Sequence, residues 1–146
     1  MRISTRSRYG LRLMLVLAAN YGQKPVLLRE IAANEGISEK YLSQIIIPLR
    51  SAGLVNSSRG VHGGYSLSRH PKHISVRDVV AVFEGDFILV DCLKNRSFCK
   101  RAAKCVTQEI WNNLGKVMVQ ALQAVTLEDL AVKYRGKINS EGLYQI

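Results

Sequence analysis

The chain has 146 residues, of which 47% are hydrophobic and 22% charged, and its formal net charge is +10. This length fits one domain with an appendage, and the hydrophobic content is sufficient for a folded core. No apolar run approaches the roughly 20 residues of a membrane span, and the first residues lack the apolar region of a signal peptide, so we expect a cytoplasmic protein that does not enter a membrane.

Basic residues are concentrated in the first half of the chain. Residues 1–75 contain 11 Lys or Arg and 3 Asp or Glu, a balance of +8, whereas residues 76–146 contain 10 and 8, a balance of +2. A generally soluble basic surface would explain the total charge but not this asymmetry. Binding to nucleic acid requires cations that are gathered on one part of the molecule, as they are here.

A first helix is predicted over residues 5–21, with Ser4 or Thr5 as its N-cap. Apolar residues at helical spacing indicate a buried stripe, which consists of Leu11, Met14, Leu15 and Ala18. Arg8 lies near the start of this helix, where it can meet a phosphate of a bound nucleic acid. The same arginine suits a solvated surface equally well.

Two short helices joined by a turn are predicted next. Leu28–Glu35 has apolar residues at helical spacing, and Gly36 allows the positive φ that ends such a helix. Ser38 suits the N-cap of a second helix, whose apolar face consists of Leu42, Ile45, Ile46 and Leu49. This order is that of a helix-turn-helix, and exposed residues near the start of its second helix are expected to reach base edges: Glu39, Lys40, Ser43 and Gln44. Tyr41 suits core packing and phosphate contact equally.

A β-hairpin is predicted directly behind the second helix. Two short apolar runs flank the polar, glycine-rich turn Ser57–Gly64, which gives the layout of a winged helix. Arg59 suits a narrow minor groove, and Gly60 and Gly63 let the backbone approach DNA closely. His62 is assigned to a phosphate contact or plain surface, because it has no partner at metal-ligand spacing. The predicted DNA-binding set is Arg8, Ser38, Glu39, Lys40, Tyr41, Ser43, Gln44, Arg50, Arg59, Gly60, His62 and Gly63.

Two further helices begin at sequences typical of capping boxes. Ser75 with Asp78 opens a short helix that ends near Gly85 and completes the DNA-binding unit. Thr126 with Asp129 opens a last helix, expected over Leu127–Lys133.

Three cysteines, Cys92, Cys99 and Cys105, lie among basic residues in the segment 86–105. An odd number of thiols in a reducing compartment argues against a disulfide framework. Neighbouring cations favour the thiolate, which is the form that binds metal or is oxidised. Three thiolates suit zinc or an iron–sulfur cluster, each of which normally takes four ligands. Redox-active thiols and inert cysteines are alternatives that this pattern leaves open.

A long helix is predicted from Cys105 to Val125. No segment of the chain is long enough to cover its apolar side, so we expect a matching helix from a second copy, although a core helix on its own domain is the alternative. Gly115 would allow close approach where the two helices cross. The apolar side consists of Val106, Ile110, Leu114, Val117, Met118, Ala121 and Val125.

These predictions describe a mainly α-helical chain with a small β-hairpin wing. Residues 1–85 form a winged helix-turn-helix domain, and residues 86–105 form a cysteine loop. Residues 106–135 contain the dimerisation helix and the C-terminal helix, and residues 136–146 form a flexible tail.

The order of these motifs resembles the Rrf-two family of winged-helix transcriptional regulators. The N-terminal part of the resemblance rests on Arg2–Thr5 with Arg8–Gly10, on Ile37–Gln44, on Leu49–Val55 and on the wing Arg59–Tyr65. The cysteine loop resembles the iron–sulfur members of that family, together with Val106, Thr107, Trp111 and Thr126–Leu130.

The resemblance implies a homodimer that binds a palindromic operator in double-stranded DNA, most often as a repressor. It also implies a [2Fe–2S] cluster on Cys92, Cys99 and Cys105, which is expected to be lost from a sample prepared in air. The iron–sulfur members carry a histidine three residues after the third cysteine, but the residue here is Gln108. We hypothesise that Glu109 supplies the fourth ligand instead.

Two other functions are considered. Cluster-free members of the same family respond through a partner enzyme of cysteine synthesis, so a repressor regulated by such a partner or by thiol oxidation is the second hypothesis. An enzyme is not expected, because the sequence has no nucleotide-binding glycine loop, no paired carboxylates beside a histidine and no Cys-x-x-Cys.

Overall fold

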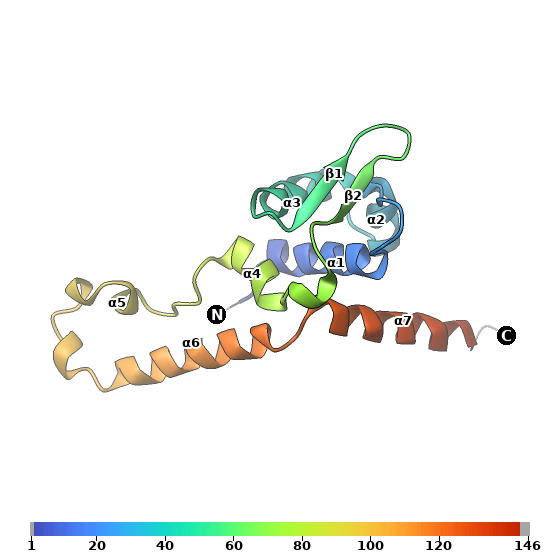
Figure 1. Cartoon of the computed structure of the whole chain (residues 1–146). Helices are drawn as coiled ribbons and strands as arrows, with labels where there is room; N and C mark the ends of the chain where they lie inside the picture. Colours follow the sequence, from blue (N-terminus) through green and yellow to red (C-terminus); the bar gives the residue numbers. More distant parts are fainter. Residues whose placement is uncertain (1, 144–146) are drawn as a thin grey trace.

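The computed structural model describes residues 2–143 as a mainly helical chain with one two-stranded antiparallel hairpin (Figure 1). The predicted fold class is confirmed. The helices are α1 (Thr5–Ala19), α2 (Leu28–Glu35), α3 (Glu39–Ser51), α4 (Val76–Glu84), α5 (Asp91–Lys94), α6 (Thr107–Gln123) and α7 (Leu127–Leu143), and the strands are β1 (Val55–Ser58) and β2 (Gly64–Leu67).

Helix α1 is the centre of the core, because α3, α4, α7 and β2 all pack against it. Its side chains Leu13, Met14 and Leu17 are almost completely buried. The predicted stripe is therefore only partly correct, since Leu11 and Leu15 are half-buried. A helix that is packed on more than one side has a wider buried arc than the single stripe that periodicity describes.

The wing is joined to the rest of the domain by backbone hydrogen bonds. Strand β1 pairs with β2 so that Val55 lies opposite Leu67 and Ser58 opposite Gly64. Val26, which precedes α2, adds an isolated bridge to Tyr65, with N–H···O distances of 2.9 and 2.8 Å. The root of the wing is thereby fixed against the start of the helix-turn-helix.

The two predicted capping boxes are confirmed at the starts of α4 and α7, where their reciprocal hydrogen bonds measure 2.8–3.1 Å. The structure brings these two helix starts side by side. The backbone N–H of Val76 donates to the carbonyl of Val125 at 2.9 Å, and that of Leu127 donates to the carbonyl of Ile74 at 2.9 Å. Helix α7 is therefore attached at its first residue to the segment that precedes α4.

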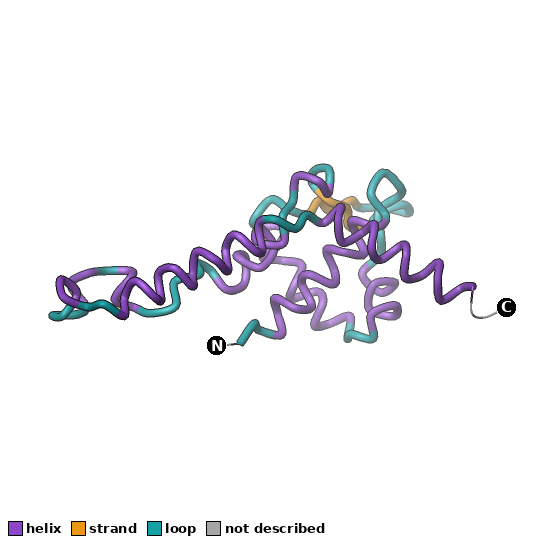
Figure 2. The backbone as a smooth tube through the Cα atoms, turned by 90° about the horizontal axis from the view of Figure 1, so that it is seen from below, coloured by secondary structure: helices purple, strands orange, loops and turns teal. Residues whose placement is uncertain are grey.

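The segment 86–105 and α6 project from the compact unit as an arm (Figures 1 and 2). The segment contains α5 and two short 3₁₀ turns, Arg96–Phe98 and Ala102–Lys104. The predicted helix from Cys105 to Val125 is too long at both ends, since Cys105 has an extended backbone and α6 begins at Thr107.

Gly115 is buried within α6, but its surroundings differ from the expected crossing with a helix of a second copy. A Cβ atom at this position would lie 2.8 Å from the carbonyl oxygen of Phe87. The close approach that this glycine permits is therefore with the segment 86–88 of its own chain.

Helix α7 extends beyond the predicted end at Lys133 as far as Leu143. Its first turns carry the buried residues Leu127 and Ala131, which pack into the core. The tail expected over residues 136–146 is thus helical up to Leu143, and residues 144–146 lie outside the described residues. Among residues 2–143, none of the helices combines the length and the apolar character that a membrane crossing requires.

Candidate nucleic-acid interface and cysteine segment

Helix α3 turns one face away from the core. Ser38 caps its start, because the Ser38 hydroxyl oxygen accepts the backbone N–H of Tyr41 at 3.0 Å. Four residues expected to reach base edges are exposed, namely Glu39, Lys40, Ser43 and Gln44. The hydroxyl of Ser43 donates to the carbonyl of Lys40 at 2.6 Å, so its proton is used within the helix.

Three arginines line one depression between the start of α2, the helix α3 and the wing. Arg29, Arg50 and Arg59 share this depression of about 670 Å³ with Glu39. Arginines that line one depression beside an exposed helix suit the phosphates of DNA. Arg29 was missed in the sequence analysis, although it lies in the first turn of a helix that enters the helix-turn-helix.

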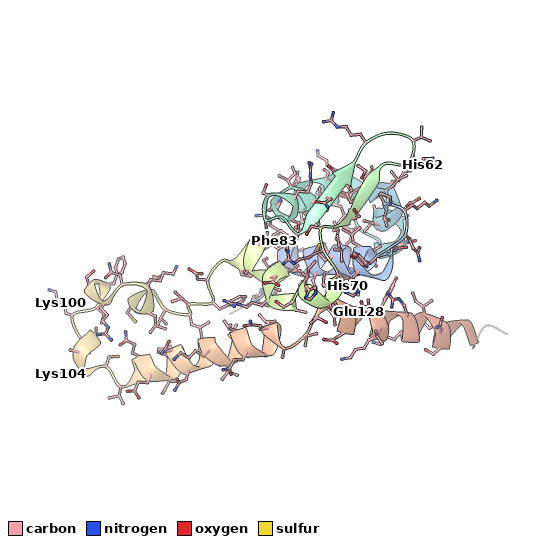
Figure 3. The ribbon with its side chains drawn as sticks, viewed as in Figure 1. His62, His70, Phe83, Lys100, Lys104 and Glu128 are labelled. Carbon is pink, nitrogen blue, oxygen red and sulfur yellow. The ribbon has the colours of Figure 1, made fainter. Side chains whose placement is uncertain are left out.

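The tip of the wing has the backbone geometry that glycine permits. Gly60 has a φ of +100°, and a Cβ atom on Gly63 would lie 2.6 Å from the carbonyl oxygen of Ser58. Arg59 and His62 are both exposed, and Figure 3 shows His62 at the end of the hairpin, away from the core. The tip can therefore approach another molecule without steric hindrance from the domain.

The start of α1 adds an aromatic and cationic cluster to this surface. Tyr41 is half-buried and meets Tyr9 edge-on, with ring centroids 5.8 Å apart, so packing accounts for its position. The guanidinium carbon of the exposed Arg8 lies 6.0 Å from the centre of the Tyr9 ring. Arg12 instead pairs with Glu35 at 2.7 Å, which fastens α1 to α2.

A carboxylate at the end of α4 holds the start of α1. Glu84 Oε1 accepts the backbone N–H of Ser4 at 2.8 Å and also accepts the hydroxyl of Ser7. Hydrogen bonds from Ser4 and Ser7 hold the pKa of Glu84 below its usual value. The last residue of α4 is thus linked directly to the helix that carries Arg8.

The three cysteines are free thiols, and the structure brings two of them together. Cys92 and Cys105 line one depression of about 570 Å³ with Glu109, whereas Cys99 is not among its lining residues. Within residues 2–143, no three Cys, His, Asp or Glu side chains are close enough to share a metal ion. The predicted ligand set of three thiols with Glu109 is therefore only partly gathered.

Helix α6 contributes two contacts to this depression. The side-chain amide of Gln108 donates to the carbonyl of Cys92 at 3.3 Å, which joins α5 to α6. The Cys105 sulfur lies 3.3 Å from the Thr107 hydroxyl, and hydrogen bonds from Thr107 and from the backbone of Gln108 lower the pKa of this thiol. In its donor chemistry the segment fits an iron–sulfur cluster, since it has three thiols and the lowered pKa of Cys105 favours the ligating thiolate form.

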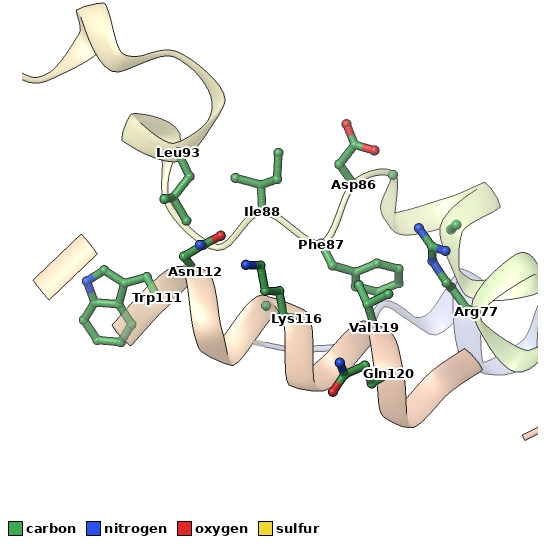
Figure 4. A pocket seen from close by; sticks show the side chains of 13 residues that line it. Arg77, Asp86, Phe87, Ile88, Leu93, Trp111, Asn112, Lys116, Val119 and Gln120 are labelled. Atoms are coloured by element: carbon green, nitrogen blue, oxygen red, sulfur yellow. The ribbon is translucent and has the colours of Figure 1, made fainter. Parts of the chain in front are cut away.

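The two sides of α6 differ in how they are covered. On one side, Phe87, Ile88 and Leu93 face Trp111 and Val119 across a depression of about 460 Å³ (Figure 4). The other side carries large apolar residues that the chain leaves exposed: Val106, Ile110, Leu114 and Val117. An uncovered apolar stripe on a helix that projects from the domain is a surface suited to a protein partner.

An exposed helix-turn-helix, a hairpin wing and an arginine-lined depression between them define a winged-helix DNA-binding protein. The family model Rrf2, described as an iron-dependent transcriptional regulator, matches residues 3–133. The chain belongs to this family, which is the Rrf-two family that its sequence motifs resemble.

Individual relatives agree with this assignment. The chain is 42% identical to the protein rrf2 of Nitratidesulfovibrio vulgaris over 130 residues, which are 89% of this chain and 87% of the relative. CymR, the global cysteine regulator of B. subtilis, has a similar structure, with a TM-score of 0.77, 39% identity and coverage of 91% of this chain and 98% of CymR. IscR of T. potens gives a TM-score of 0.75 at 37% identity, with coverage of 92% and 88%. CymR of Bacillus subtilis and IscR of Vibrio cholerae are described as HTH-type transcriptional regulators.

Proposed function

We propose that this protein is a homodimeric regulator that binds a palindromic operator and senses iron–sulfur, redox or nitric oxide status through its cysteine segment, as an IscR-type protein. The observation that carries the DNA-binding part is the placement of Arg29, Arg50 and Arg59 around one depression beside the exposed face of α3. Base-reading residues of α3 would lie in the major groove, and the wing arginine would lie in the adjacent minor groove.

The dimer is supported by the uncovered stripe of α6. Ile110 is 58% exposed and Val117 59% exposed, although both are large apolar residues on a well-formed helix. The same stripe of a second copy would cover them, because a twofold axis brings identical surfaces together. A twofold protein in turn requires an operator with two related half-sites.

The sensing role is supported by the donor chemistry of the arm. Cys92, Cys99 and Cys105 would hold the cluster, and Glu109 would be the fourth ligand because it lines the same depression as Cys92 and Cys105. A bound cluster would supply a charge that depends on iron supply and oxidation state. The chain's own contribution is to lower the pKa of Cys105 through Thr107 and to hold the Cys92 backbone through Gln108.

A short route connects this segment to the DNA-binding surface. The segment begins directly after Gly85, and the preceding Glu84 is bonded to Ser4 and Ser7 at the start of α1. A change in the arm would therefore be transmitted to the helix that carries Arg8. A tenfold change in operator affinity needs only about 1.4 kcal/mol of such coupling.

A second candidate function is a cluster-free repressor of the CymR type, regulated by a partner protein or by thiol oxidation. Two observations favour it. The chain is 41% identical to CymR of Bacillus subtilis over 131 residues, and the described residues gather only two of the three thiols. The candidates differ in whether a metal cluster is present, so they can be separated by spectroscopy.

The test is anaerobic purification followed by absorption spectroscopy and assays of iron and sulfide. A cluster sensor should show visible bands with about two iron and two sulfide per protomer. These bands should be absent from a variant in which Cys92, Cys99 and Cys105 are all replaced by Ala. Glu109→Ala should shift the bands, and an unchanged spectrum would exclude Glu109 as the ligand.

The same preparations should be tested on double-stranded DNA that the wild-type protein selects from a random pool. The cluster hypothesis predicts different affinities with and without the cluster, and the triple cysteine variant should behave like the cluster-free form. A colourless protein that still binds its selected DNA would support the second candidate. A protein that selects no sequence would contradict both.

A further inference from the structure

The exposed face of α3 carries a large apolar side chain that the core does not use. Ile47 is 59% exposed, whereas the neighbouring Ile45 and Ile46 are almost fully buried. Between residues 22 and 60, it is the only exposed large hydrophobic residue. The core does not cover this side chain, so Ile47 is available for an apolar contact with a bound molecule.

Ile47 shares the exposed face of α3 with residues that the sequence predicts to contact DNA. It follows Lys40 by seven residues and Ser43 by four, so the three side chains lie on one face over about two helical turns. The Ser43 hydroxyl donates to the Lys40 carbonyl at 2.6 Å, so it does not offer its proton to a molecule that contacts Ile47. Arg50 and Asn56 line a shallow depression with Ile47 on the side of β1.

We propose that Ile47 reads the 5-methyl group of a thymine in each half-site of the operator. This inference rests on the proposed function, since it requires α3 to enter the major groove. Thymine is the base that presents an apolar group there, and an apolar side chain discriminates it through that methyl group. The cations beside Ile47 fit DNA better than an apolar protein surface. Helix α3 also lies on the other side of α1 from α6, away from the proposed dimer contact (Figure 1).

The test compares thymine with uracil, which lacks only the methyl group. Duplex DNA is selected from a random pool by the full-length wild-type protein, and each thymine of the selected site is replaced in turn by deoxyuridine. Binding is measured by fluorescence anisotropy for the wild type, for Ile47→Ser and for Val132→Ser. Val132 is a matched control, because it is 56% exposed on α7.

At one thymine position of each half-site, deoxyuridine should weaken wild-type binding about fourfold, as expected for one buried methyl group. The same replacement should leave the affinity of Ile47→Ser unchanged, and Val132→Ser should respond like the wild type. Equal responses of the wild type and Ile47→Ser at every position would overturn the inference and leave the proposed function intact. A wild type that enriches no sequence would contradict both.

Discussion

The contact between Glu84 and the start of α1 should contribute measurably to stability, and Glu84→Gln tests it. The carboxylate accepts hydrogen bonds from Ser4 at 2.8 Å and from Ser7, and it lies at the positive end of the α1 dipole. A hydrogen bond to a charged group contributes about 1.5–3 kcal/mol, and a neutral one about 0.5–1.5 kcal/mol. Glutamine retains one neutral acceptor in a half-buried site, so we expect a loss of about 1 kcal/mol, or about 2–4 °C in melting temperature.

The effect of Glu84→Gln should depend on pH in a defined direction. The pKa of Glu84 is lowered in the folded protein from a usual value of 4.5. A carboxyl group of this kind contributes its stability above the unfolded pKa and loses it as the pH falls through the folded pKa. The difference in the free energy of unfolding between wild type and Glu84→Gln should therefore be fully present at pH 7 and diminish below about pH 4.5.

The assay is thermal unfolding followed by circular dichroism between pH 7 and pH 3, at one protein concentration and with reduced thiols. The control is Asp86→Asn, which neutralises an exposed carboxylate two residues further along the chain. This change should stay within about 0.5 kcal/mol of the wild type. A loss for Glu84→Gln that is as large at pH 3 as at pH 7 would refute the electrostatic origin of the contact.

Three other predictions follow from the structure. Gly115→Ala should lower the melting temperature, because its Cβ atom would lie 2.8 Å from the Phe87 carbonyl oxygen. The control is Gly136→Ala in α7, where the Cβ atom meets open space, and this change should raise the free energy of unfolding by up to about 1 kcal/mol. If both alanine variants were stabilised equally, the packing of α6 on the segment 86–88 would be wrong. Arg29→Ala should weaken binding to DNA of every sequence equally and reduce the slope of log Kd against log salt concentration by about 1. Fluorescence anisotropy at several salt concentrations measures this slope, and an unchanged slope would exclude a phosphate contact of Arg29. Val117→Asp should produce monomers in sedimentation experiments, and a variant that remained dimeric would exclude the α6 stripe as the interface.

Local sequence patterns determined the helix-turn-helix and the wing. Gly36 has the left-handed conformation that ends α2, Ser38 caps α3, and the four apolar residues of α3 are buried. The caps and the helical spacing involve residues fewer than five positions apart, which capping preferences and periodicity describe directly, whereas the pairing of Val55 with Leu67 in the wing spans twelve positions.

The positions of α6 and α7 followed from the sequence only in part. Both capping boxes could be predicted, but the bridge that joins Ser75 to Thr126 links residues that are distant in the chain. The periodicity of α6 predicted an apolar side without showing that Gly115 packs against Phe87 of the same chain. A spacing rule describes the face of a helix and contains no information about what lies opposite.

The cysteine segment and the arginine depression show the same division. The amino-acid sequence shows that three thiols lie among cations and that the net positive charge is concentrated in the first half of the chain. It does not show that Cys92 and Cys105 share a depression without Cys99, or that Arg29 lies with Arg50 and Arg59, which follows from the folded structure. The type of a side chain is fixed by the sequence, whereas its neighbours depend on how helices pack, and packing is the sum of many contacts between residues that are remote in the chain.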